Sequence, residues 1–336
     1  MGTTQELENA LNALGPKLGG TDGRVSDLKR LSGGASQETW AFDFGPDKGP
    51  VEELILRRAP GGVSAARSQA AIGLENEAAL IDRAVAAGVP APRVIHSCEP
   101  QDGLGQAFIM NRIAGETIAR KILRDDEYAT ARQKLAAQCG SAAALIHSID
   151  IADVPELPRS MGEDQLAQYE EIYRGFETPR PVFELAIQWL KASVPEAVEP
   201  SLVHGDFRLG NLIVDETGLV AVLDWELAHL GDRREDLAWI CINSWRFGNS
   251  ENRVGGFGAL GDFLDAYAAA GGVEVTPAEI DWWETLGSFK WGVMCMIMYE
   301  AFRSGADPSV ERAAIGRRVS ETEIDLINLL ERVRDA

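Results

Sequence analysis

The stretch that decides the fold is Leu202-Val-His-Gly-Asp-Phe-Arg-Leu-Gly-Asn-Leu-Ile-Val-Asp215, which is followed by Val220-Ala-Val-Leu-Asp-Trp-Glu226. Short apolar runs flank a polar loop, and Asp215-Glu-Thr-Gly218 supplies turn residues between two of these runs. Two apolar runs joined by a short Gly-containing turn indicate a β-hairpin. The pattern therefore predicts a hairpin that brings Asp224 back beside Asn211.

Three polar residues of this stretch have the spacing of a phosphoryl-transfer site. Asp206 and Asn211 lie five positions apart, and Asp224 ends the later apolar run. In phosphoryl transfer, one carboxylate orients and deprotonates the attacking hydroxyl, while an amide and a second carboxylate hold Mg²⁺ against nucleotide phosphates. A hairpin with solvated acids is the alternative, and it explains Asp215 and Glu216. It does not explain why His-Gly-Asp and Asp-Trp-Glu occupy hairpin-matched positions.

Size and charge limit the possible functions. The 336 residues exceed the size of a typical single domain, so we expect two lobes that share a cleft. No apolar run approaches the ~20 residues that cross a membrane, and the first residues do not resemble a secretory signal. The net charge of −20 disfavours nucleic acid and anionic membranes as partners. We expect a cytoplasmic protein, and no obligate protein partner is implied. The excess of acidic residues fits either general solubility or a cationic substrate.

The four cysteines show no CxxC spacing and are expected to be reduced, partly buried side chains. The four histidines are expected not to cluster with the cysteines, so a zinc site is not predicted. These residues are Cys98, Cys139, Cys241 and Cys295 and His96, His147, His204 and His229.

Patterns typical of strands dominate the first part of the chain, and helical patterns dominate the rest. Apolar residues alternate between Val25 and Leu56, a helix is predicted from about residue 70 to 87, and Ala107-Phe-Ile-Met110 is typical of a last strand. We predict an N-lobe over residues 1–110, a hinge or connector over residues 111–116 and a helical C-lobe over residues 117–336. The predicted fold class is α+β, with a small β-rich lobe and a larger, mainly helical lobe.

A glycine-containing segment lies between two of the predicted strands. Glycines let backbone N–H groups approach a phosphate closely, although Ser-Gly-Gly is also an ordinary hairpin turn. Because the segment precedes the hairpin by a kinase-like distance, phosphate binding is the favoured interpretation. The residues concerned are Gly33, Gly34, Ala35 and Ser36.

Arg57 and Arg58 end the third predicted strand, where kinases place a cation that clamps the nucleotide phosphates, and Arg57 is the expected clamp. Arginine stays charged and can bind phosphate through two nitrogens. Its expected partner is a carboxylate of the following helix, either Glu75 or Glu77, and Glu77 is preferred. A solvated charge pair at the strand end is the alternative.

These residues resemble the aminoglycoside phosphotransferase family of small-molecule kinases, which has the two-lobed protein-kinase-like fold. The resemblance extends from about residue 31 to about residue 299 and is most specific at His204-Gly-Asp-Phe-Arg-Leu-Gly-Asn211 and Asp224-Trp-Glu226. The sequence Leu56-Arg-Arg-Ala-Pro60 is similar to a subgroup of kinase domains associated with acyl-CoA dehydrogenases. The resemblance implies ATP (or GTP) and Mg²⁺ as cofactors.

The resemblance also implies a role for individual residues. Asp206 would be the catalytic base and Arg208 would neutralise phosphate charge, while Asn211 and Asp224 would be the Mg²⁺ ligands. The hinge that receives adenine would be Met110, Asn111 and Arg112. Two departures stand out: Arg57 replaces the usual lysine, and Gly205 replaces the arginine of protein kinases. Regulation by activation-loop phosphorylation is therefore not expected.

The helix predicted over residues 281–299 has two interpretations. Large side chains recur at helical spacing on one face, which fits either core packing or the soft wall of a cleft for an apolar acceptor. The candidate acceptor-side residues on this helix and after the hairpin are Trp283, Trp291, Met294, Trp245, Arg246 and Glu226.

The sequence thus predicts an ATP- and Mg²⁺-dependent O-phosphotransferase that acts on a hydroxyl of a small molecule. The expected acceptor is a metabolite or an amphipathic hydroxylated compound. A phosphotransferase for an antibiotic, either an aminoglycoside or a macrolide, is the alternative within the same class. A catalytically inactive nucleotide-binding regulatory module is the alternative of another class.

Overall fold

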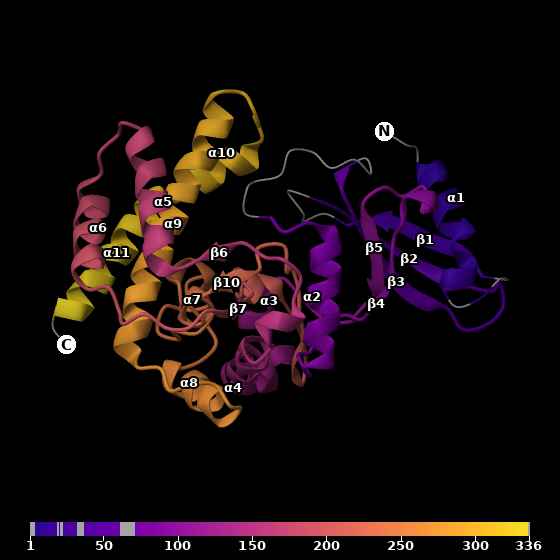
Figure 1. Ribbon diagram of the computed structural model, residues 1–336, viewed down its shortest axis with the longest axis horizontal. Coiled ribbons are helices and arrows are strands. Elements are labelled where there is room, and N and C mark those ends of the chain that lie inside the picture. The colour runs from indigo at the N-terminus through magenta and orange to yellow at the C-terminus, as the bar shows by residue number, and fades with distance from the viewer. Residues whose placement is uncertain (1–3, 19, 21–22, 32–36, 61–70, 335–336) are drawn as a thin grey trace.

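A computed structural model describes residues 4–18, 20, 23–31, 37–60 and 71–334. Figure 1 shows two lobes, with an antiparallel sheet at one end of the molecule and a group of long helices at the other. This arrangement confirms the predicted α+β class with a small β-rich N-lobe and a larger helical C-lobe. The predicted phosphate loop, residues 33–36, lies outside the described residues.

The N-lobe is built around a five-stranded antiparallel sheet with the strand order β1-β2-β3-β5-β4. Alternate residues of a strand face opposite sides, so Phe42 and Leu54 pack with helix α1, whereas Ile55 and Phe108 pack in the main core with helix α2. The elements are α1 (Thr4–Ala13), β1 (Arg24–Arg30), β2 (Glu38–Gly45), β3 (Glu52–Arg58), α2 (Leu74–Ala86), β4 (Val94–Ser97) and β5 (Ala107–Asn111).

Helix α2 lies between the sheet and the C-lobe (Figure 1). It begins at Leu74, four residues later than predicted, because Gly73 adopts a φ of 92° that is incompatible with a helix. It ends as predicted before Gly88, whose φ is 86°. Leu74, Glu77 and Ile81 recur every three or four residues and are buried. The helix therefore directs the Glu77 carboxylate into the protein interior.

The C-lobe is organised around the long helix α9, which contacts helices α5, α6, α7, α10 and α11. Residues 280–289 of α9 are all buried, so core packing accounts for most of this helix. Among the described residues no helix is both long and apolar enough to cross a membrane. The helices are α3 (Ala119–Arg124), α4 (Ala129–His147), α5 (Gly162–Gly175), α6 (Pro181–Ala192), α7 (Arg234–Trp239), α8 (Leu260–Ala269), α9 (Pro277–Arg303), α10 (Val310–Gly316) and α11 (Val319–Arg334).

Two small sheets and several 3-10 turns complete the C-lobe. Strands β8 and β9 form the predicted hairpin, in which Leu212 pairs with Val222 and Asp215 with Gly218. The strands are β6 (Arg159–Ser160), β7 (Ser201–Val203), β8 (Leu212–Asp215), β9 (Gly218–Val222) and β10 (His229–Gly231). The 3-10 helices of the C-lobe are η4 (Asp126–Tyr128), η5 (Ile151–Asp153), η6 (Leu209–Asn211) and η7 (Asn243–Trp245), and those of the N-lobe are η1 (Gly15–Lys17) and η3 (Pro100–Asp102).

The chain passes from one lobe to the other between Asn111, where β5 ends, and Ala119, where α3 begins. Glu116 lies in this segment and exchanges two backbone hydrogen bonds with Val214 of β8, at 2.8 and 3.0 Å. The segment between the lobes is therefore attached directly to the hairpin that carries the candidate site.

Candidate functional site

The hairpin brings the three phosphoryl-transfer candidates together. Asn211 Nδ2 donates to Asp206 Oδ2 at 2.6 Å and to the Asp206 carbonyl at 3.0 Å. The N–H of Leu223 donates to the Asn211 carbonyl at 2.8 Å, which places the next residue, Asp224, beside Asn211. Asp206, Asn211 and Asp224 therefore converge at the base of the β8–β9 hairpin, as the spacing predicted.

His204 connects the two loops that carry these residues. The Asp206 N–H donates to His204 Nδ1 at 3.2 Å, and His204 Nε2 lies 3.1 Å from the Leu223 carbonyl. Burial lowers the pKa of His204, so the neutral ring accepts at Nδ1 and donates at Nε2. Sequence reasoning did not assign His204 to the site, although the His-Gly-Asp motif was the signal that could have identified it.

Asp236 on α7 holds the backbone of the same loop. Its two carboxylate oxygens accept from the His204 N–H at 2.8 Å and the Gly205 N–H at 3.0 Å, and His147 Nε2 lies 3.1 Å from Oδ2. Gly205 has a φ of 81°, and an added Cβ would lie 2.4 Å from the Leu227 carbonyl oxygen. A side chain at position 205 is therefore excluded by the local backbone, which explains the glycine where protein kinases have arginine.

Arg57 links the N-lobe to the hairpin. Its Nη1 lies 3.2 Å from Glu77 Oε1, and its Nη2 donates to Asp224 Oδ1 at 3.0 Å. Glu77 is fully buried, whereas Glu75 is exposed. Of the two carboxylates that the sequence offered as partners of Arg57, the structure therefore contains the preferred one, Glu77. The arginine at the end of the third strand thus contacts both the helix carboxylate and the candidate metal ligand.

Gln37, which sequence reasoning missed, extends this contact to Glu226. Arg57 Nε donates to Gln37 Oε1 at 3.1 Å, and Gln37 Nε2 donates to Glu226 Oε2 at 3.0 Å. The Glu226 carbonyl also accepts from the Ile72 N–H at 3.0 Å. Glu226 was predicted to lie near the acceptor, but these contacts place it against the N-lobe, in the network around Arg57.

Burial and charge act in opposite directions in this network. Burial raises the pKa of Glu77 to about 7, although the Arg57 charge lowers it. Burial alone would lower the pKa of Arg57. The negative charges of Glu77 and Asp224 raise this pKa by a larger amount, so it lies above the usual value for arginine. Arg57 therefore stays charged, whereas Glu77 titrates close to neutral pH.

Two donors beside the hairpin bind the Asp206 carboxylate. Arg208 Nε donates to Oδ1 at 2.9 Å, and Trp239 Nε1 donates to the same oxygen at 2.7 Å. The Arg208 guanidinium carbon lies 4.8 Å from the centre of the Trp245 ring, and Trp245 packs against Trp291 with ring centres 4.9 Å apart. Of the predicted acceptor-side residues, Trp245 thus contacts Arg208, which binds Asp206, and Trp291 follows behind Trp245.

Trp245 and Trp291 are themselves buried, at 6% and 8% exposed, and the remaining candidates have other contacts. Arg246 donates to the Cys241 carbonyl at 2.9 Å and to Glu284 Oε1 at 2.5 Å, so its guanidinium is held by buried groups. Trp283 is only 3% exposed and lies about 12 Å from Trp291 along the helix axis. Met294 is partly buried and packs against the main core. The structure groups Trp245 and Trp291 but not Arg246 or Trp283.

The predicted hinge residues use several of their polar groups within the N-lobe. The Asn111 N–H donates to the Arg93 carbonyl at 3.1 Å, and the Arg112 N–H donates to the Glu53 carbonyl at 2.8 Å. The Arg112 guanidinium also binds Asp43 at 2.8 Å, while Met110 is buried in the sheet. These contacts fix the end of β5 at the passage between the lobes.

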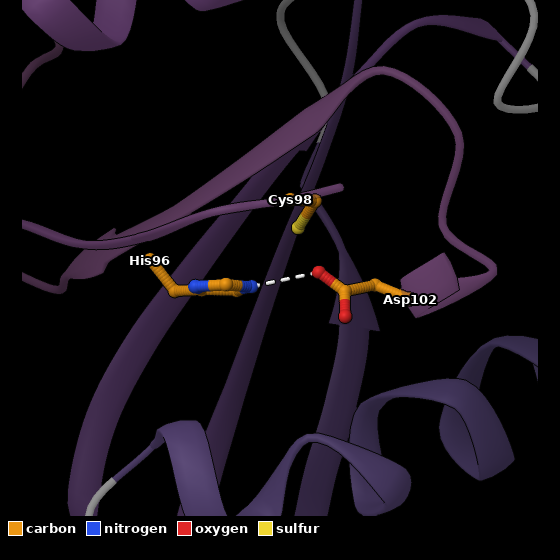
Figure 2. Close-up of side chains that lie close together, drawn as sticks. All are labelled: His96, Cys98 and Asp102. Carbon is orange, nitrogen blue, oxygen red and sulfur yellow. Dashed lines mark hydrogen bonds and ion pairs between the residues drawn. The ribbon is translucent and has the colours of Figure 1, made fainter. Parts of the chain in front are cut away.

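The expectation that the histidines do not cluster with the cysteines was wrong for one pair. His96 lies beside Cys98 and Asp102 in the N-lobe (Figure 2). His96 Nε2 lies 2.8 Å from Asp102 Oδ2, and Lys17 Nζ lies 2.7 Å from Asp102 Oδ1. The Glu99 N–H donates to the same carboxylate at 2.9 Å, and burial raises the pKa of the Cys98 thiol to about 12. Both carboxylate oxygens already have partners, so the contacts favour a structural link between η1 and β4 over a metal site.

Comparisons with known proteins agree with this geometry. Residues 27–283 match the model of the phosphotransferase enzyme family APH. Mouse acyl-CoA dehydrogenase family member 10 is 31% identical over 202 residues, which are 56% of this chain and 18% of that protein. Acyl-CoA dehydrogenase family member 11 from Pongo abelii is 22% identical over 343 residues, 96% of this chain and 43% of that protein. The chain thus spans less than half the length of these relatives.

Solved structures show the same fold. A Ralstonia eutropha protein assigned as an aminoglycoside phosphotransferase has a TM-score of 0.74 at 20% identity, covering 96% of this chain and 98% of that chain. An aminoglycoside phosphotransferase mutant in complex with AMP-PNP and hygromycin B has a TM-score of 0.59 at 16% identity, covering 98% of each chain. At these identities the likeness concerns the fold alone. Because the family model matches most of the chain, including the hairpin and the Arg57 strand, this protein belongs to the APH phosphotransferase enzyme family.

Proposed function

We propose that this protein transfers the γ-phosphoryl group of ATP, or GTP, to a hydroxyl group of a small molecule. The reaction forms a phosphate ester and a nucleoside diphosphate, and the hydroxyl proton passes to Asp206. The observation that carries the proposal is the convergence of Asp206, Asn211 and Asp224, in which Asn211 Nδ2 lies 2.6 Å from Asp206 Oδ2.

The surroundings of Asp206 suit a catalytic base that must be held in one orientation. Its carboxylate accepts hydrogen bonds from Arg208, Trp239 and Asn211, at 2.9, 2.7 and 2.6 Å. A carboxylate offers about four lone-pair sites, so one site is left for the acceptor hydroxyl. Its side chain is 14% exposed, which leaves it accessible. The hydroxyl would be oriented by this remaining site and deprotonated as the bond to phosphorus forms.

The donor set beside Asp206 fits Mg²⁺. Asn211 uses its Nδ2 to bind Asp206, which leaves the carboxamide oxygen as a ligand, and Asp224 contributes a carboxylate. Oxygen ligands of this kind suit Mg²⁺, which would neutralise negative charge of the nucleotide phosphates when bound. We propose Asn211 and Asp224 as the metal-holding residues.

The residues around Arg57 are proposed to bind the rest of the nucleotide. Arg57 would hold the phosphates, and Glu77 would orient its guanidinium from a distance of 3.2 Å. The backbone of residues 33–36 would cover the phosphates, and Met110, Asn111 and Arg112 would receive the base. Because the Asn111 and Arg112 N–H groups bind carbonyls of the N-lobe, the base would use other backbone groups of the 111–116 hinge.

We propose a metabolite or another amphipathic hydroxylated compound as the acceptor. Trp245, which contacts Arg208, and Trp291, which packs against Trp245, would contact its apolar part, and Arg208 would neutralise charge on the transferred group. Two relatives are named as acyl-CoA dehydrogenases, which favours an acyl compound over an antibiotic. A drug-modifying role is the second candidate, supported by the fold shared with the hygromycin B complex.

A transfer assay with γ-labelled ATP and Mg²⁺ tests this proposal. The purified protein is incubated with hydroxyacyl-CoA thioesters in one arm and with aminoglycosides and macrolides in the other. We expect label on an acyl acceptor, and we expect Asp206→Ala to abolish transfer while ATP still binds in a thermal-shift assay. Undiminished transfer by Asp206→Ala would refute the role of this residue. Binding of ATP without transfer or hydrolysis would instead show an inactive nucleotide-binding module.

A further inference from the structure

Trp239 makes the shorter of the two hydrogen bonds to Asp206 Oδ1. Its Nε1 lies 2.7 Å from this oxygen, compared with 2.9 Å for Arg208 Nε, and the Trp239 side chain is only 5% exposed. We propose that Trp239 is a positioning residue whose indole N–H fixes the Asp206 carboxylate in the orientation that accepts the hydroxyl proton. This inference rests on the proposed role of Asp206 and adds a residue that the motifs did not indicate.

Helix α7 reaches the catalytic loop through two residues of one face. Asp236 accepts from the backbone N–H groups of His204 and Gly205, at 2.8 and 3.0 Å. Trp239 follows three positions later, and residues at this spacing are neighbours on a helix surface. A single helix face therefore fixes both the backbone of the loop and the side chain of Asp206, so the two are aligned with each other.

The Trp239 ring is itself held on several sides. The Lys290 ammonium lies 5.2 Å from the ring centre and forms an ion pair with Glu235 at 3.1 Å. The Trp245 ring lies 5.6 Å away, and Gly287 permits close approach, since a Cβ there would lie 3.3 Å from Trp239 Cε3. A donor whose own position is fixed by packing fixes its acceptor without a cost of reorganisation.

Trp239 and Arg208 share one oxygen but supply different properties. Arg208 is a charged side chain that is 25% exposed and lies over Trp245. Its charge and its exposure suit a group that neutralises charge on the transferred phosphate. Trp239 is a neutral donor whose ring is buried. It therefore orients Asp206 through a hydrogen bond without placing a second positive charge against the carboxylate that must accept a proton.

The substitution Trp239→Phe retains the ring and removes the N–H. With water as the acceptor, the steady-state hydrolysis of Mg·ATP to ADP and phosphate is measured. We expect kcat to fall roughly tenfold, the effect of losing one hydrogen bond to a charged group, and KM for Mg·ATP to stay unchanged. An unchanged kcat overturns the positioning role.

A matched control separates positioning from stability. Trp282→Phe also removes a buried indole N–H, which donates to the Leu190 carbonyl at 3.0 Å within the helical part of the C-lobe. We expect both variants to lower Tm, but only Trp239→Phe to lower kcat at constant KM. Equal effects of the two variants on kcat would show a purely structural role and overturn the proposal.

A second measurement does not depend on turnover. In ¹H–¹⁵N spectra the Trp239 indole signal is identified by its absence from Trp239→Phe, and Asp206→Ala is expected to shift this proton upfield because a charge-assisted hydrogen bond is lost. An unshifted signal overturns the contact. If Asp206→Ala retains full transfer, the proposed function fails. If Asp206→Ala abolishes hydrolysis while Trp239→Phe retains the wild-type kcat, only the positioning role fails.

Discussion

The Arg57 guanidinium donates to the Asp224 carboxylate through Nη2 at 3.0 Å, and its Nη1 lies 3.2 Å from the Glu77 carboxylate. A strand residue of the N-lobe is thereby joined to the loop that follows the β8–β9 hairpin. The side chain proposed to bind phosphates therefore forms an ion pair with the side chain proposed to bind the metal.

The first prediction concerns the choice of arginine at position 57. Lysine carries a single ammonium and cannot span Glu77, Asp224 and Gln37 at the same time. We expect Arg57→Lys to raise KM for Mg·ATP roughly tenfold with a smaller effect on kcat. Arg58→Lys is the matched control, since Arg58 is the next residue of β3 and pairs with Glu38 at 3.1 Å. Similar KM values for the two variants would contradict the clamp.

The second prediction concerns the pH dependence of stability. Burial raises the pKa of Glu77 from 4.5 to about 7, so the folded protein holds this proton more tightly than the unfolded chain does. The stability that this proton contributes is present below pH 4.5 and is lost as the pH rises through about 7. Glu77→Gln cannot titrate, so we expect its free energy of unfolding to decline less between pH 4.5 and 7 than that of the wild type.

Urea unfolding at several pH values measures this difference. All other titrating groups are common to both proteins, so the difference between the two curves isolates Glu77. Parallel curves for the wild type and Glu77→Gln would show that the carboxyl group has an unshifted pKa in the fold.

The third prediction concerns Asp224 as a metal ligand. Asp224→Asn removes the negative charge, so Mg²⁺ should strengthen ATP binding by the wild type but not by the variant, a difference of roughly 10- to 100-fold. In EDTA the variant should bind ATP at least as well, because Arg57 no longer pairs with a carboxylate at 3.0 Å. Calorimetric titration with and without Mg²⁺ measures both values, and Asp215→Asn, in the turn of the same hairpin, is the control. Equal responses of the two variants to Mg²⁺ would remove Asp224 from the metal site.

The fourth prediction concerns Gly205 of the catalytic loop. An alanine there meets both a φ of +81° and the Leu227 carbonyl, 2.4 Å from the added Cβ. Gly271 has a φ of +98° with nothing within 4 Å, so Gly271→Ala measures the backbone cost alone, about 1 kcal/mol. We expect Gly205→Ala to lower the free energy of unfolding by at least ~2 kcal/mol. Equal losses in the two variants would show that the loop moves aside at no cost.

Local sequence was sufficient for the hairpin and for the strand β3 that carries Arg57. The turn Asp215-Glu-Thr-Gly218 and the flanking apolar runs determine the register, and the register places Asp224 beside Asn211. The spacing of apolar residues along α2 likewise places Glu77 on the buried face of the helix and Glu75 on its exposed face. In each case the decisive interactions join residues that are close in the chain.

The boundary of α2 and the position of His96 were not predicted correctly. The start of the helix depends on the positive φ of Gly73, which a helical pattern does not reveal. His96 meets Asp102 because the chain turns back through η3, and Lys17 completes the contact from a distant segment. Such encounters depend on how segments pack, which no local spacing encodes.

The sequence by itself determined the fold class, the hairpin and the identity of the three converging polar residues, because short-range pattern and turn chemistry suffice for these. Only the tertiary structure decided that Gln37 joins Arg57 to Glu226 and that Trp239 binds Asp206. It also decided that Arg246 is held in the interior by Glu284. These contacts join residues that are 20 to 189 positions apart, and a side chain acquires such a partner only when separate elements pack together.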